Sequence, residues 1–131
     1  MTILRKQIYM GYESKIYIAE KSGLKDDDGM TYAQVIAVFD MCKMGNLINA
    51  FDRKTDCYFY ADDGNTKVLE DRYGDALTEA EIEDFIYALE EAVGNGENYR
   101  RIFPLLSALQ TICEQQKDGK WKNIVLLHYG Y

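Results

Sequence analysis

Residues 121–129 read WKNIVLLHY, and this stretch decides the fold that the sequence predicts. Successive residues of a β-strand point to opposite faces, so the four apolar residues from Ile124 to Leu127 would place apolar side chains on both faces. A strand of this kind is typical of the centre of a sheet that is covered on both sides. We therefore expect a central strand over 121–129, covered by helices.

A hairpin upstream supplies the other two strands expected in this sheet. Residues 57–61 and 66–70 flank Asp62-Asp63-Gly64-Asn65, a run of residues that tolerate the left-handed backbone conformation. A register that pairs Ala61 with Thr66 sets the neighbours across the hairpin: Phe59 with Val68, Tyr58 with Leu69 and Tyr60 with Lys67. We expect the last strand to pair beside this hairpin.

Two helices are predicted in the second half of the chain. Thr78 and Glu81 form a capping-box pattern, and an apolar stripe follows at helical spacing: Ile82, Phe85, Ile86, Leu89 and Val93. Pro104 suits the first position of another helix, one side of which is apolar: Leu105, Leu106, Leu109, Ile112 and Cys113.

Apolar residues at three- and four-residue steps predict two more helices in the first half. One covers about 3–21, with Thr2 as its cap, and one covers 32–44, where Thr31 and Gln34 form a capping box. Residues 46–52 would add a helical turn. The sequence thus predicts an α+β fold with about four helices on a small three-stranded sheet (hairpin 57–70 plus strand 121–129), as one globular domain over 1–131.

Composition indicates a folded, cytoplasmic protein. Of the 131 residues, 47% are hydrophobic and 28% are charged, as in ordinary globular domains. No stretch approaches the roughly 18 apolar residues of a membrane span. Arg5 and Lys6 interrupt the beginning of the chain, where a signal peptide would need an apolar core.

The charge distribution bears on partners. The net charge of −7 combines +3 in residues 1–25, −13 in residues 26–97 and +3 in residues 98–131. A nucleic-acid binder needs a surplus of lysine and arginine to displace counterions, so direct nucleic-acid binding is not expected. We expect a protein partner with a basic surface, and no association with a membrane.

The residues that could carry metal or nucleophilic chemistry are few and widely spaced. Cys42, Cys57, Cys113 and the single His128 show no paired spacing of the kind found in zinc sites, so we expect reduced thiols, no metal and no cofactor. The sequence contains no phosphate-binding glycine motif and no nucleophile elbow.

These observations favour a non-catalytic protein-binding or regulatory module with an acidic, tyrosine-bearing surface. The candidate residues lie on the outer face of the helix after Thr78 and on the hairpin: Glu83, Tyr87, Glu90, Glu91, Tyr60, Asp62 and Asp63. A sharper version is an inhibitor whose carboxylates imitate nucleic-acid phosphates. The alternative is a small cytosolic enzyme that uses a cysteine or His128 with carboxylates in a cleft. A concave pocket where ionisable side chains converge would favour the enzyme, and a convex acidic ridge would favour binding.

Overall fold

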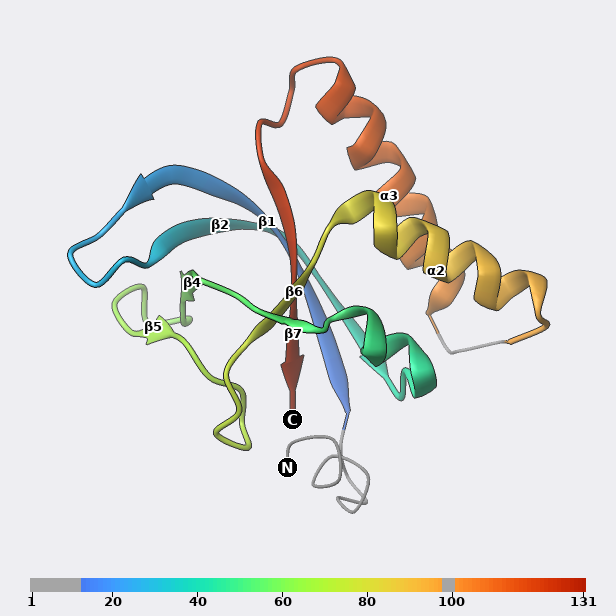
Figure 1. The fold of residues 1–131 in the computed structure, drawn as a ribbon, viewed down its shortest axis with the longest axis horizontal. Coiled ribbons are helices and arrows are strands. Elements are labelled where there is room, and N and C mark those ends of the chain that lie inside the picture. Colours follow the sequence, from blue (N-terminus) through green and yellow to red (C-terminus); the bar gives the residue numbers. More distant parts are fainter. Residues whose placement is uncertain (1–12, 98–100) are drawn as a thin grey trace.

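The computed structural model describes residues 13–97 and 101–131, and a curled, mixed sheet of seven strands dominates it (Figure 1). The strands are β1 (Ser14–Lys25), β2 (Thr31–Cys42), β3 (Arg53–Lys54), β4 (Cys57–Tyr60), β5 (Lys67–Val68), β6 (Thr78–Ala80) and β7 (Ile124–Gly130). Their order across the sheet is β3-β6-β7-β1-β2-β4-β5, and all neighbours are antiparallel except β2 and β4. The helices are the short 3-10 helix η1 (Gly45–Ala50), α2 (Ile82–Gly94) and α3 (Ile102–Lys117).

This architecture shows that the predicted α+β fold is wrong. Instead of about four helices on three strands, the described residues form seven strands and three helices, of which only α2 and α3 are long. The helices expected over 3–21 and 32–44 are replaced by β1 and β2, and the part of the first one before residue 13 lies outside the described residues. Thr31 and Thr78 begin β2 and β6, so neither caps a helix.

The error has a physical cause. A four-residue step is an even number, so it places side chains on one face of a strand as well as on one face of a helix. In β1, burial alternates from Ser14 through Ile16 to Ile18, as in a strand. The register of β2 shifts between Val35 and Ala37, so Val35 and Phe39 pack in different clusters rather than on one face.

Strand β7 lies in the interior of the sheet, between β1 and β6. Ile124 to His128 are all buried, but helices cover only one face. On that face α2, α3 and η1 close the larger cluster, which includes Ile16, Phe85, Leu89, Leu109 and Leu126. On the other face β4 and β5 complete a smaller cluster that includes Ala19, Ala33, Cys57, Phe59 and Leu127. The last strand therefore does not lie beside the β4–β5 hairpin, because β1 and β2 separate them.

The locally determined elements agree with the sequence. Helix α2 buries Ile82, Phe85 and Leu89, and the β4–β5 hairpin pairs Phe59 with Val68 and Tyr60 with Lys67. Helix α3 is present, but it begins at Ile102 rather than at Pro104, so its predicted start is wrong by two residues. Among the residues that the structure describes, no helix has the length and apolar character needed to cross a membrane.

Candidate functional site

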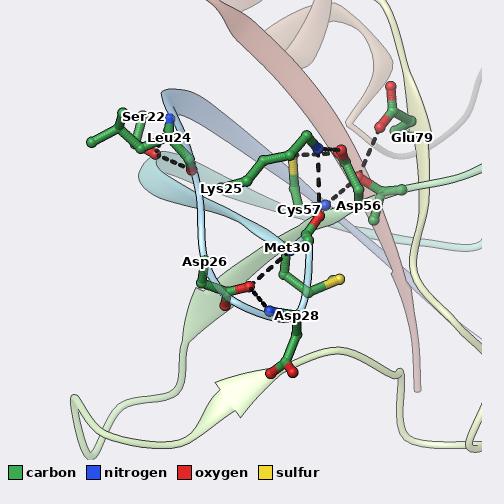
Figure 2. A network of polar contacts seen from close by, with 11 residues as sticks. Ser22, Leu24, Lys25, Asp26, Asp28, Met30, Asp56, Cys57 and Glu79 are labelled. Carbon is green, nitrogen blue, oxygen red and sulfur yellow. Dashed lines mark hydrogen bonds and ion pairs between the residues drawn. The ribbon is translucent and has the colours of Figure 1, made fainter.

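Two hairpin ends meet on the side of the molecule away from α2 and α3 (Figure 1). In the turn between β1 and β2, the Asp26 carboxylate accepts the backbone N–H groups of Asp28 and Met30, each at 2.9 Å (Figure 2). The Lys67 ammonium, on β5, donates to the other oxygen of Asp26 at 2.8 Å. This ion pair lowers the pKa of Asp26 and raises that of Lys67, because each charge favours the charged form of its partner.

Three tyrosine rings lie in mutual contact beside this ion pair. The ring centre of Tyr32, on β2, lies 5.9 Å from that of Tyr58 and 5.4 Å from that of Tyr60. Tyr58 and Tyr60 meet edge to face at 5.6 Å, and Lys67 Nζ lies 4.5 Å from the Tyr58 ring centre. Tyr58 is buried by its neighbours whereas Tyr60 is 40% exposed, so the cluster shows one aromatic side to solvent.

The two hairpins that carry this cluster also expose apolar and acidic residues. Leu24 is 78% exposed at the end of β1, and Asp27, Asp28 and Asp62 are exposed in the two turns. We call this region the hairpin-tip surface: Leu24, Asp26, Asp27, Asp28, Tyr32, Tyr58, Tyr60, Asp62, Asp63 and Lys67. It combines an aromatic centre with charged surroundings, which is the usual anatomy of a protein interface.

The two aspartates predicted on this hairpin have different roles. The Asp63 carboxylate accepts the Thr66 hydroxyl at 2.5 Å and the backbone N–H groups of Asn65 and Thr66 at 2.8 Å. These hydrogen bonds, the one from Thr66 foremost, lower the pKa of Asp63 to about 2. Asp63 therefore shapes the turn, whereas the exposed Asp62 is the better candidate for contact with a partner.

The other predicted group lies elsewhere. Glu83, Tyr87, Glu90 and Glu91 are exposed on α2, where Tyr87 is 69% exposed. Because α2 packs on one face of the sheet and β4–β5 on the other, the structure does not bring the two predicted groups together. An inhibitor that imitates nucleic acid would need one continuous array of carboxylates, so that version of the function finds no support.

Tyr32 and Leu24 are not among the residues that the sequence predicts at a binding surface. The predicted helix over 32–44 includes Tyr32, whereas its contact with Tyr58 depends on the parallel pairing of β2 with β4, which pairs Thr31 with Cys57 and Tyr32 with Tyr58. The signal available in the sequence was the run of β-branched and aromatic residues from Thr31 to Phe39, which favours a strand.

A polar network lies beside the β1–β2 turn (Figure 2). It brings ligand atoms of Asp56, Cys57 and Glu79 within 4.8 Å of one another, a grouping that the sequence spacing did not reveal. The Lys25 ammonium, however, already pairs with Asp56 and lowers the pKa of that carboxyl, and Thr55 donates to Glu79 at 2.8 Å. Burial raises the pKa of the Cys57 thiol, so this sulfur stays protonated near neutral pH. These contacts stabilise the network without a metal ion.

A second grouping of three possible ligands, Glu13, Asp40 and Cys42, is likewise engaged. The Tyr131 hydroxyl donates to Asp40 at 2.6 Å and contacts Glu13 at 3.2 Å. The hydrogen bond from Tyr131 lowers the pKa of Asp40 and raises that of Tyr131 itself. These hydrogen bonds connect the C-terminal residue, which follows β7, to the start of β1 and to β2.

The structure provides a cleft for the enzyme alternative, but the described residues that line it do not include a nucleophile paired with a base. A cleft of about 560 Å³ beside the start of α2 is lined by six charged side chains: Lys21, Arg53, Glu79, Glu81, Glu83 and Lys117. His128 is buried, bonds to Ser14 Oγ at 2.8 Å and does not line this cleft. Cys113 lines it, but its polar neighbour is the Glu83 carboxylate at 3.8 Å rather than the histidine or lysine that activates a nucleophilic thiol.

Comparison with known proteins provides no relative from which roles could be carried over to these residues. No protein-family model, no curated protein and no solved structure matches the chain.

Proposed function

We propose that this chain is a non-catalytic protein-binding module whose hairpin-tip surface engages a basic segment of another protein. The observation that carries the proposal is the cluster of Tyr32, Tyr58 and Tyr60, whose rings pack on one another and which is open to solvent at Tyr60, on two hairpins with acidic turns. Tyrosine is enriched among the residues that dominate binding energy, because a large ring with a polar tip gains contact area at low entropic cost.

Pre-organisation supports this choice over the outer face of α2. Ring contacts restrain Tyr60 on two sides, and the ion pair between Lys67 and Asp26 fixes the two hairpins relative to each other. A surface that is already ordered loses less conformational entropy on binding. Tyr87 on α2 is more exposed, and no ring contact with it is found among the described residues.

Charge defines the chemistry of the partner. Asp27, Asp28 and Asp62 are exposed in the turns of the two hairpins, whereas Lys67 pairs with Asp26. An acidic border attracts a lysine- or arginine-rich segment, speeds its association and makes binding weaken with salt. An exposed arginine of the partner would also stack on the open tyrosine face.

The test compares two matched surface variants with the wild-type chain. Tyr60→Ala with Asp62→Asn alters the hairpin-tip surface, and Tyr87→Ala with Glu90→Gln alters α2. Each chain is used to select binders from a displayed library of random linear peptides, and the selected peptides are measured by surface plasmon resonance at low and high salt. We expect peptides rich in lysine and arginine whose affinity falls about tenfold or more in the hairpin variant only, as for loss of an interface hot spot.

Two outcomes would contradict the proposal. Loss of affinity in the α2 variant alone would move the binding surface to Glu83, Tyr87, Glu90 and Glu91. Equal affinity for all three chains, or selected peptides without basic residues, would exclude the hairpin-tip surface as a site for a basic segment. Amide spectra of both variants serve as the control that the fold is retained.

A further inference from the structure

The cleft beside α2 is separate from the hairpin-tip surface, since none of the residues of that surface lines it. Six elements contribute to it, from Lys21 on β1 to Val125 on β7, so its shape depends on the completed sheet. Ala80, Ile82 and Val125 contribute buried apolar residues to its wall, with exposures of 3%, 5% and 2%. Its volume of about 560 Å³ is that of sites that hold small molecules.

The charges in the cleft are unequally compensated. Arg53 lies 3.5 Å from a Glu79 oxygen and 3.9 Å from a Glu81 oxygen, so these three groups neutralise one another in part. Lys21 and Lys117 line the same cleft, and no described carboxylate comes within 4.0 Å of either ammonium. Within the described part of the chain, these two cations thus lie in one cleft without a carboxylate at ion-pair distance, although the net charge is −7.

The remaining polar groups are those that bind uncharged parts of a ligand. Asn123 and Gln116 add side-chain amides to the lining, and the Gln116 amide is held by the carbonyl of Lys122 at 3.2 Å. Carboxylate oxygens of Glu79 and Glu81 can accept hydrogen bonds from hydroxyl or amino groups. The cleft thus offers cations, hydrogen-bonding groups and an apolar wall together.

We propose that this cleft binds a small organic anion whose carboxylate or phosphate group pairs with Lys21 and Lys117. Hydroxyl or amino groups of the same molecule bond to the carboxylates and amides of the lining. Charge-assisted hydrogen bonds to two lysines supply most of the affinity. Glu83, the third carboxylate of the lining, opposes the anion through like charge and limits that affinity.

Three related probes separate the anionic group from the hydroxyl groups: glycerol 3-phosphate, glycerate and glycerol. Each is titrated into the wild-type chain, and backbone amide shifts around Asn123 and Glu83 are followed by NMR. We expect saturable binding of glycerol 3-phosphate or glycerate at about millimolar concentration, which corresponds to roughly −4 kcal/mol, and none of glycerol. The preferred anion identifies the group that the lysines recognise.

Single substitutions test whether each charged residue of the lining strengthens or weakens binding of the anion. Lys21→Met and Lys117→Met should each weaken binding about tenfold, because each removes one charge-assisted hydrogen bond. Glu83→Gln should tighten binding, since it removes the opposing charge. Lys54→Met is the matched control, because Lys54 is exposed on β3 and does not line the cleft, and it should leave affinity unchanged.

Equal weakening by Lys54→Met and Lys21→Met would show only a general response to net charge and would overturn the proposal. Binding of glycerol as tightly as the anions, or no saturable binding of either anion, would overturn it as well. Tyr60→Ala should leave this titration unchanged. The titration therefore tests the anion site independently of the proposed protein-binding function.

Discussion

The ammonium of Lys67 lies 2.8 Å from the Asp26 carboxylate, and this contact joins two hairpins whose paired residues are 41 positions apart in the chain. Asp26 uses one oxygen for this ion pair and the other for the backbone of its own turn. A single side chain therefore shapes one hairpin end and ties it to the other. The position of the tyrosine cluster between the two ends depends on both functions.

Substitution of Asp26 separates these functions. Asp26→Asn keeps an oxygen that can accept the N–H groups of Asp28 and Met30 but removes the charge that holds Lys67. We expect unchanged hydrogen exchange at these two amides and a fall in the pKa of Lys67 toward its ordinary value, because the raising charge is lost. Asp26→Ala should also speed exchange at both amides. NMR measures both quantities, and faster exchange in Asp26→Asn would contradict this division.

Leu89 tests the orientation of α2. Its side chain is fully buried in the larger cluster, so Leu89→Ala should lower the free energy of unfolding by about 2–5 kcal/mol through lost contacts and a residual cavity. Denaturant titration measures the change. Glu90→Ala, at the next and exposed position, should change stability by no more than about 0.5 kcal/mol. Equal effects of the two substitutions would show that α2 faces the sheet differently.

The Asp63 turn predicts a pH dependence of the β4–β5 hairpin. The pKa of Asp63 is lowered from 3.8 to about 2 in the folded chain, so its carboxylate stabilises the turn fully above pH 3.8. That contribution is lost as the pH falls through about 2. We expect a carboxyl titration near 2 by NMR, together with faster hydrogen exchange at Asn65 and Thr66 as Asp63 becomes protonated.

Asp62 provides the control for this prediction. Asp62→Ala leaves the turn hydrogen bonds of Asp63 in place, so exchange at Asn65 and Thr66 should stay as in the wild type. Asp63→Ala should accelerate it at every pH. If Asp62→Ala has the larger effect, the assignment of Asp63 as the residue that shapes the turn is wrong.

The three cysteines should differ in their reactivity with a thiol reagent. Cys57 is inaccessible and Cys113 nearly so, whereas Cys42 is half-buried. We expect Cys42 to react first, and Cys57 to react only at the rate of unfolding, since burial also raises the pKa of its thiol. Cys42→Ser should remove the fast phase and leave the slow ones. A fast phase that persists in this variant would contradict the assignment.

All three cysteines should also be reduced in the purified chain, and a chelator should leave its thermal unfolding unchanged. A chelator should have no effect because the carboxylates of the Asp56, Cys57 and Glu79 grouping already have partners. Lys25 pairs with Asp56, and the Thr55 hydroxyl donates to Glu79. Elemental analysis and calorimetry with EDTA check this. A stoichiometric metal would contradict it.

How much of the fold the sequence predicts depends on how local each element is. Helix α2 and the register of β4–β5 follow from neighbouring residues, and both are present. Strand β1 is stabilised by pairing with β2 on one side and β7 on the other. These partners are distant in sequence, so the local pattern of β1 and β2 is also compatible with a helix. The β-branched and aromatic composition of residues 31–39 favours a strand, but the cross-strand pairing that decides between strand and helix is not visible in a single sequence.

The same reason limits prediction of the hairpin-tip surface. Tyr60, Asp62 and Asp63 were identified because a turn between two strands is visible in the sequence. Tyr32 was not, since it reaches the cluster only through the pairing of β2 with β4. The sequence gives even less indication of the cleft at α2, because its lining comes from five separate segments of the chain.

The position of β7 also has a consequence for how the chain folds. This strand contributes Leu126 to one cluster and Leu127 to the other, and its His128 bonds to Ser14 across 114 positions. Neither cluster is complete until this distant segment has docked, and its docking closes a loop of almost the whole chain. Folding should accordingly be slow for a chain of this length, as in other proteins of high contact order. Because the two clusters share one strand, they should also melt together in a single cooperative transition.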